Sequence, residues 1–427
     1  MDELVLVSQI LQRSAPELLH SDYLSRRDVS RELRMFDRVY AICVGKCANR
    51  SAAGTSLAIG GRLEAGLVID DEVGNYPFPL PVTFQHITGD HPLPSIGSYR
   101  AAEAVKQTVR KWELTPKDLV IVSISGGTSS MISSPIESLE IEDLERINAI
   151  LLRSGQDVSA INSVRRRVSE LHDGGLAEIL IPGNVWTLLQ SDNAQGDATA
   201  VGSGPTLASA RPIADTAVKA LKKADSVLCE RVLSAIAEAP IKRLTSGQVV
   251  ELSNIASLAK DCRSTLEANG FRVSLLPFPT DGSSEKIENT FRSVIEADSG
   301  SEPVAYVMCG EAAISVPEVG NPVGGRCQHV ALTLLPIVAS VLDSTLICYA
   351  TDGRDCLENI HGALITDQLA RHIQTESDIN KALSTGTSYT VLNSAGALIL
   401  GERTGQNLCD IYMILRGWSR AAHQESV

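Results

Sequence analysis

The chain of 427 residues is long enough for two or three domains. Apolar residues make up 44% of it and charged residues 21%, which allows large buried cores and argues against disorder. A net charge of −13 and an aromatic content of 4% disfavour nucleic acid and anionic membrane surfaces as partners.

The N-terminal stretch MDELVLVSQILQRSAPELL has acidic residues near its start and no basic segment before the apolar positions. This pattern is typical of an amphipathic helix and not of a signal peptide. The sequence contains no apolar run of about 18 residues, the length that a membrane-spanning helix needs. Nine cysteines without a CxxC pair support neither a disulfide framework nor a zinc site, so we expect a cytoplasmic protein with buried free thiols.

Short β-branched runs recur along the chain, each followed by small residues and then by a helical pattern such as YRAAEAVKQTVRKW (99–112). The runs are VYAICVGK (39–46), LVIVSIS (119–125), VWTLLQSD (185–192), RVSLLPF (272–278), VAYVMCGE (304–311) and STLICYATD (344–352). This alternation predicts an α/β fold with a mostly parallel sheet and ligands at the carboxyl ends of its strands. We expect a domain boundary near IKRLTSGQVV (241–250), which gives one domain over residues 1–245 and a second, smaller α/β domain over 246–427. A cleft between the two domains would be the natural ligand site.

The stretch ISGGTSS (124–130) follows a buried strand. Gly126 and Gly127 would let a ligand approach the backbone closely, and the hydroxyls of Thr128 and Ser129 could donate to phosphate oxygens. A tight strand–helix turn with a helix cap fits the same residues equally well. The stretch is neither a Walker A loop nor a nucleophile elbow.

Charged residues stand at several strand ends. Lys46 opens a helix, where its charge suits an anion, although a solvated surface lysine fits as well. Asp192 could bind magnesium, act as a general base or form a turn, and Glu311 and Asp352 hold similar positions.

A second glycine-rich loop, GNPVGGRCQHVAL (320–332), places Arg326 directly after Gly324 and Gly325, which suits bidentate binding of an anion. Acidic strand ends beside glycine–arginine loops are what magnesium-nucleotide chemistry requires, so the set favours a phosphoryl-transfer enzyme. His91, in the loop HPLPS (91–95), could contact substrate or be structural. Asn162 could contact substrate or cap a helix, and Arg165 belongs to an arginine trio that favours a solvated helix face.

In their order and spacing, these motifs resemble the glycerate 2-kinase family, a glycerate-kinase domain followed by a MOFRL-type domain. The resemblance covers nearly the whole chain, although no single motif is specific. It rests on VGKCANRSAAG (44–54), HPLPS, ISGGTSS, LLRSGQDVSAINSVRRRVS (151–169), SD with SGPT (191–206), GNPVGGRCQHVAL, ATDGRD (350–355) and GERTGQNLCDI (401–411).

The resemblance implies a Rossmann-like first domain and phosphorylation of the 2-hydroxyl of D-glycerate, or of a related small hydroxy acid, by ATP with Mg²⁺. Lys46 would contact the reacting phosphate, and Arg326 would be the arginine of the GGRN loop. Asp192 and Glu311 would lie at the magnesium ion or at the substrate hydroxyl. The implied nucleotide-binding residues are Ser125, Gly126, Gly127, Thr128, Ser129, Gly324 and Gly325; the implied substrate-binding residues are His91, Asn162, Arg165 and Glu311; the implied metal ligands are Asp192 and Asp352. A homodimer is compatible with this interpretation, and no GxGxxG motif supports a nicotinamide site.

The sequence departs from the family pattern at the motifs themselves. Ser95 replaces the aspartate of HPxPD, His172 replaces the lysine of KGG, and His329 replaces the glutamate of GGRNQE. Further changes are Cys327 for asparagine, Cys356 for glycine, and Glu402 with Arg403 for glycine and proline. Because Lys46, Asp192, Glu311 and Arg326 are retained, we expect an active, diverged kinase, with a catalytically silent ligand-binding homologue as the alternative.

Overall fold

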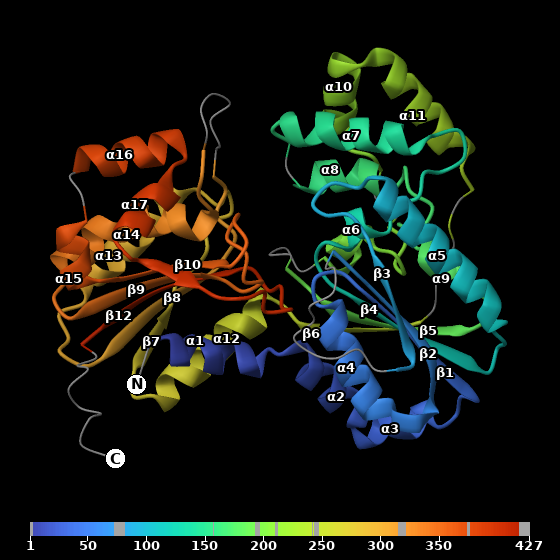
Figure 1. Ribbon diagram of the computed structural model, residues 1–427, viewed down its shortest axis with the longest axis horizontal. Coiled ribbons are helices and arrows are strands. Elements are labelled where there is room, and N and C mark those ends of the chain that lie inside the picture. The colour runs from blue at the N-terminus through green and yellow to red at the C-terminus, as the bar shows by residue number, and fades with distance from the viewer. Residues whose placement is uncertain are drawn as a thin grey trace. The chain divides into compact units, whose positions relative to one another are not determined.

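The computed structural model describes residues 3–71, 82–156, 158–192, 197–209, 212–240, 242, 247–314, 322–373 and 376–417. The chain forms two compact units (Figure 1). The parallel-sheet unit spans Pro16–Asn254, and the mixed-sheet unit combines Met1–Ala15 with Ile255–Val427. The sequence predicted a boundary after residue 245, whereas the structure includes strand β6 (Gln248–Ser253) in the first unit and helix α1 (Glu3–Arg13) in the second.

The parallel-sheet unit contains a six-stranded sheet in the order β3-β2-β1-β4-β5-β6, and every neighbouring pair is parallel. Its strands before β6 are β1 (Arg38–Val44), β2 (Leu63–Asp70), β3 (Phe84–Thr88), β4 (Asp118–Ile124) and β5 (Asn184–Gln190). The central strands are buried almost throughout, as continuous apolar strands covered on both faces must be. The α/β prediction, with its parallel sheet, is confirmed for this unit.

Helices cover both faces of the parallel sheet because side chains alternate along each strand. Val39, Ala41 and Cys43 of β1 pack on one face against α2 (Pro16–Ser25), α3 (Arg27–Leu33) and α4 (Ala48–Ile59). Tyr40, Ile42 and Val44 pack on the other against α5 (Ile96–Trp112) and α9 (Gly175–Ile179). Shorter elements are η1 (Gly60–Arg62), α6 (Thr128–Met131) and η2 (Ala198–Ser203).

Four helices of this unit gather away from the sheet and form what we call the helical subdomain (Figure 1). They are α7 (Ile141–Arg153), α8 (Val158–Arg165), α10 (Asp215–Ala224) and α11 (Ser226–Glu238). The subdomain has its own core, to which Ile147, Leu151, Val164, Leu221 and Val232 contribute. It therefore folds around contacts separate from those of the sheet.

The mixed-sheet unit contains a second six-stranded sheet in the order β11-β10-β9-β12-β8-β7, in which only β7 and β8 pair in parallel. Its strands are β7 (Arg272–Leu275), β8 (Val304–Gly310), β9 (Ser344–Ala350), β10 (Ile360–Thr366), β11 (Leu398–Leu400) and β12 (Asp410–Arg416). The final strand, β12, inserts between β8 and β9 and runs antiparallel to both. The second domain is thus α/β as expected, with a mixed sheet.

Two groups of helices sandwich the mixed sheet (Figure 1). One face carries α13 (Ser284–Ala297), α14 (Arg326–Ser340), α15 (Asp367–His372), α16 (Glu376–Thr385) and α17 (Ser388–Ser394). The other carries α12 (Ile255–Ala268) and α1, whose Leu6, Val7 and Ile10 are buried against that face. This burial explains why the N-terminal helix belongs to the C-terminal unit, a pairing that local patterns do not reveal.

All nine cysteines are free thiols, and only Cys356 is exposed. This agrees with the expected buried thiols. Among the helices of the described residues, none combines the length and the apolar character that crossing a membrane would require.

Candidate functional site

The centre of the parallel sheet is a topological switch point, because the chain moves outward from β1 to β2 and β3 and then returns to β4 on the other side of β1. Open α/β sheets bind ligands outside the carboxyl ends of the strands at such a point. Val44, Ile124 and Leu189 lie in register at the ends of β1, β4 and β5. The loops that follow these strands carry Lys46, Gly126 and Asp192, so the structure places all three at one edge of the sheet.

The loops after β1 and β4 are joined to each other by close packing and hydrogen bonds. Gly45 has a φ of 107°, and a Cβ there would lie 2.4 Å from the Ser125 Oγ. The Lys46 amide donates to the Gly126 carbonyl at 2.9 Å, and the Cys47 amide donates to the Ser125 Oγ at 3.0 Å. The backbone around Lys46 is therefore held by the protein itself.

The hydroxyl groups of ISGGTSS make contacts within the protein. The Thr128 Oγ1 lies 2.8 Å from the Ser125 carbonyl and 3.0 Å from the Val44 carbonyl, and the Ser129 and Ser203 hydroxyls are 2.8 Å apart. The helix that follows, α6, has four residues. The hydroxyls thus stabilise the loop, and their proposed contact with phosphate stays a prediction.

Lys46 and His91 approach each other at Gly127. A Cβ on Gly127, whose φ is 88°, would lie 3.3 Å from the His91 Cδ2 and 3.4 Å from the Lys46 Cγ. The His91 Nδ1 is 3.6 Å from the Asp71 Oδ2, so a carboxylate lies close to the ring. The atom nearest to that position is the Met131 Cε, at 2.9 Å, so the glycine lets Met131, His91 and the stem of Lys46 pack closely against the backbone.

The charges of Asp192 and Lys46 both act on the thiol of Cys47. Burial raises the pKa of the Cys47 thiol to about 12, with Asp192 acting in the same direction and Lys46 opposing it. Both charges therefore act on one thiol at the start of α4. The sequence predicted both residues for this edge of the sheet.

The Ser95 departure has a structural explanation. The Ser95 hydroxyl and the Ser98 amide, the latter at 3.0 Å, both donate to the Asp90 Oδ2. A carboxylate therefore still occupies the N-terminus of α5, where it is electrostatically favourable, but it comes from Asp90. Sequence reasoning missed this residue, although it stands directly before His91.

His172 stands where the family has a lysine, but the side chain of another lysine, Lys242, lies beside it. The Lys242 Nζ donates to the carbonyls of Ser169 at 2.8 Å and His172 at 2.5 Å. Burial lowers the pKa of Lys242 to about 8 and that of His172 to about 3, so His172 is neutral. The cation is retained at this turn by a residue distant in sequence, which no local motif signals.

Arg165 lies within the helical subdomain. Its Nε donates to the Asn148 Oδ1 at 2.5 Å, and burial lowers its pKa. The carbonyl of Asn162 accepts from the Arg166 amide one turn later in the same segment. The guanidinium of Arg165 thus holds α8 to α7, and the substrate contact predicted for Arg165 and Asn162 stays a prediction.

Arg326 of the mixed-sheet unit is bound by two carboxylates. Its two terminal nitrogens donate to the two Glu311 oxygens at 3.0 Å each, and its Nε donates to the Asp410 Oδ2 at 3.2 Å. Asp410 is 2% exposed, and the Tyr412 hydroxyl donates to the same oxygen at 2.9 Å. The structure pairs Arg326 with Glu311 and adds Asp410, which the sequence analysis did not single out; the catalytic role of Arg326 and the substrate contact of Glu311 stay predictions.

The glycines before Arg326 pack against the protein itself. A Cβ on Gly325 would lie 2.1 Å from the Asp355 Oδ1, and one on Gly324 would lie 2.1 Å from the Ser388 Oγ. The Asp355 carboxylate accepts the amides of Cys327 at 3.0 Å and Gln328 at 2.9 Å. A protein carboxylate therefore occupies the N-terminus of α14, and the nucleotide contact predicted for Gly324 and Gly325 stays a prediction.

The two residues predicted as metal ligands lie in different units, Asp192 in the parallel-sheet unit and Asp352 in the mixed-sheet unit. The Asp352 Oδ1 accepts the Arg354 amide at 2.9 Å, as in an Asx turn. Within the described ranges, no three or more His, Cys, Asp or Glu side chains form a group that could hold a metal ion. The metal-binding roles of Asp192 and Asp352 stay predictions.

Comparisons with known proteins agree with this architecture. A domain of unknown function, DUF4147, matches residues 4–239, and the MOFRL family matches residues 304–410. A glycerate kinase from Thermotoga maritima has a similar structure, with a TM-score of 0.81 and 25% identity over 96% of this chain and 97% of that one. A protein from Pyrococcus horikoshii shares the fold, with a TM-score of 0.71 and 22% identity over 97% and 98% of the two chains.

Relatives similar in sequence carry two different names. The D-glycerate 2-kinase of Thermotoga maritima is 27% identical over 88% of this chain and 90% of its own length. A putative hydroxypyruvate reductase of Agrobacterium vitis is 31% identical over 78% of this chain and 88% of its own. The chain therefore belongs, as a diverged member, to the glycerate 2-kinase family, in which a DUF4147 domain precedes a MOFRL domain.

Proposed function

We propose that the protein is an ATP-dependent kinase that phosphorylates the 2-hydroxyl of D-glycerate or of a related small hydroxy acid. The position of Lys46 at the switch point, directly before α4 and close to His91, carries this proposal, because a cation there suits a transferring phosphoryl group. The N-terminus of α4, a helix of 12 residues, adds partial positive charge at the same place. Relatives named glycerate 2-kinase supply the substrate class.

In this proposal, the chain's own residues position charge and move one proton. ATP supplies the phosphoryl group and Mg²⁺ neutralises phosphate charge when they are bound. Lys46 binds the oxygens of the transferring group and stabilises the charge that develops on them. Asp192 either holds the metal ion or accepts the proton of the substrate hydroxyl. Mg²⁺ commonly uses one or two carboxylates together with phosphates, so a single Asp192 suits it without a protein cage.

One observation favours the alternative, a homologue that binds ligand without turnover. All three nitrogens of the Arg326 guanidinium donate to Glu311 or Asp410. An arginine that contacts a phosphoryl group must give up part of such an arrangement. The changes at positions 172 and 329 also alter charge at family motifs.

Release of ADP by the purified protein, with Mg-ATP and a panel that includes D-glycerate, tests the proposal. Lys46→Met should lower turnover roughly 100- to 1,000-fold, the usual cost of removing one transition-state contact. Lys117→Met is the matched control, because the side chain of Lys117 is 76% exposed and lies far along the sequence from the proposed loop. Equal turnover in both variants would refute the role of Lys46. A rise in melting temperature with ATP, but no ADP from any acid, would favour the silent homologue.

A further inference from the structure

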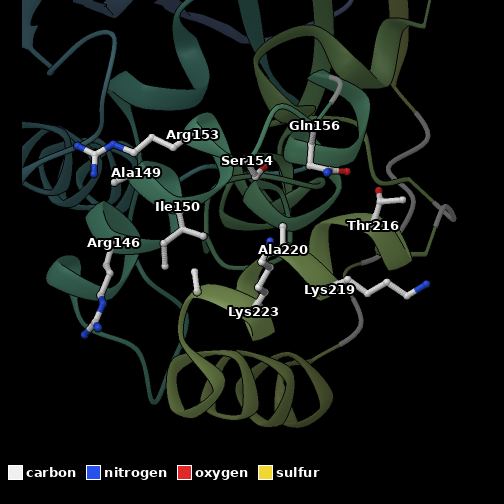
Figure 2. A pocket seen from close by; sticks show the side chains of 11 residues that line it. Arg146, Ala149, Ile150, Arg153, Ser154, Gln156, Thr216, Lys219, Ala220 and Lys223 are labelled. Atoms are coloured by element: carbon white, nitrogen blue, oxygen red, sulfur yellow. The ribbon is translucent and has the colours of Figure 1, made fainter. Parts of the chain in front are cut away.

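A groove lies on the helical subdomain, between α7 and α10 (Figure 2). Its volume is about 890 Å³, within the range of pockets that hold small organic ligands. Arg153, Ser154 and Gln156 of its lining belong to the stretch 151–169 on which the family resemblance rests, but no residue assigned to the kinase site lines it. It is therefore a feature of the molecule that the proposed function does not explain.

The floor of the groove is apolar and built from small side chains. Ala149 and Ile150 of α7 face Ala220 of α10 across the hollow. All three are only partly buried, whereas their neighbours Ile147 and Leu221 fill the core beneath. The alanines leave space that larger residues would have closed, so apolar surface remains open to a ligand.

The rim of the groove is cationic in a protein whose net charge is −13. Arg146 and Arg153 stand on α7, and Lys219 and Lys223 stand on α10 (Figure 2). Arg146 pairs with Asp225 at 2.7 Å. The other three form no ion pair with any residue in the described ranges.

Helix dipoles explain only part of this charge. A cation in the last turn of a helix is favourable, and Arg153 and Lys223 hold such positions. Lys219 lies one turn before the end of α10, and Arg146 lies two turns before Arg153. Arg146 is neutralised by Asp225, and Figure 2 shows Arg153 and Lys219 extending to opposite sides of the hollow, so three cations remain along its rim to attract an anion.

We propose that this groove binds a small organic anion with an apolar body, such as a medium-chain or aromatic carboxylate. The apolar body would cover the floor at Ile150 and Ala220, and the acidic group would lie at the α10 side of the rim, where Lys219 and Lys223 stand. The lining residues include no aromatic side chain on which a nucleobase could stack, so a nucleotide fits less well. This site is independent of the proposed kinase site, and its test does not require turnover.

Fluorescence titration with 8-anilinonaphthalene-1-sulfonate, an aromatic sulfonate, tests the proposal on the full chain at low salt. Lys219→Glu/Lys223→Glu should weaken its binding about tenfold or more, because two attractive charges become repulsive. Lys222→Glu is the matched control, since Lys222 is exposed on the same helix and does not line the groove. Lys219→Gln/Lys223→Gln, which introduces no new charge, should weaken binding less than the reversal and still more than the control.

Competition separates the two parts of the proposed ligand. Decanoate should displace the probe, whereas acetate lacks the apolar body and decanol lacks the charge, so both should displace it poorly. Hydrogen exchange should show protection by decanoate in α7 and α10 of the wild type and not in the doubly reversed variant. Equal probe affinity in the reversed variant and the Lys222→Glu control would overturn the proposal, as would displacement by acetate or decanol equal to that by decanoate.

Discussion

Asp410→Asn should flatten the pH dependence of stability of the mixed-sheet unit. Asp410 is 2% exposed, and burial is the largest cause that raises its pKa, to about 7. Nearby carboxylates, of which Glu311 acts most strongly, raise it further, and Arg326 opposes them. The folded protein therefore holds a proton on this group at pH values where an unfolded aspartate, with a pKa near 3.9, has lost it.

The sign and the size of the effect follow from this difference. A carboxyl group with a raised folded-state pKa contributes stability that is fully present below about pH 4 and is lost as the pH rises through about 7. The difference of about 3 units corresponds to about 4 kcal/mol over the whole range. Between pH 5 and pH 8 the wild type should lose roughly 2–3 kcal/mol through this group alone.

Urea unfolding at pH 5, 6, 7 and 8, followed by far-UV circular dichroism, measures the effect. Hydrogen exchange in β12 assigns the transition to the mixed-sheet unit. Asp118→Asn is the control, because hydrogen bonds from Arg38 lower the pKa of Asp118 to about 2 and its contribution is therefore lost only in more acidic solution. If the stability of Asp410→Asn runs parallel to that of the wild type from pH 5 to pH 8, the assignment of a raised pKa to Asp410 is wrong.

Three further changes test the packing. Burial lowers the pKa of His20 to about 4, so the free energy of unfolding should fall as the pH drops from 6.5 through 4. In urea unfolding followed by tryptophan fluorescence, His20→Gln should lose this pH dependence, and an unchanged pH dependence would exclude His20 as its cause. Gly45→Ala should destabilise the protein by about 1–3 kcal/mol, because the φ of residue 45 is 107° and the new Cβ would lie 2.4 Å from the Ser125 Oγ. A urea midpoint equal to that of the wild type would contradict this. Phe291→Ala should lower the free energy of unfolding by about 3–5 kcal/mol, since Phe291 is fully buried. A loss below about 1 kcal/mol, measured by urea unfolding, would contradict this and show that the site collapses around the cavity.

The sequence predicted the parallel-sheet unit well because its strands are buried on both faces and appear as uninterrupted apolar runs. The residues that end such strands share one edge of the sheet, which is how Lys46 and Asp192 could be placed together. The position of β12 and the pairing of α1 with α12 depend instead on contacts between segments far apart in the chain. No local pattern carries that information.

The two glycine-rich loops show a different limit of prediction. Both place two glycines before a helix, and the sequence analysis expected an anionic ligand at both. In the structure, the space that Gly325 leaves receives the Asp355 carboxylate, whereas the space at Gly127 receives the apolar end of Met131 and lies beside His91 and the stem of Lys46. A glycine pattern predicts close approach, and it does not say whether a ligand or the protein itself approaches.

This difference separates the roles of the two units in the proposed kinase. Asp355 already accepts the first amides of α14, so a phosphate there would have to displace a carboxylate that the helix binds. Cys47, the N-cap residue of α4, makes no side-chain cap hydrogen bond, and Lys46 stands directly before it. The electrostatic demand for an anion is therefore greater at α4 than at α14. In the proposed kinase, we therefore expect the phosphoryl group to bind at the edge of the parallel sheet, while Arg326 serves first as the partner of Glu311 and of buried Asp410.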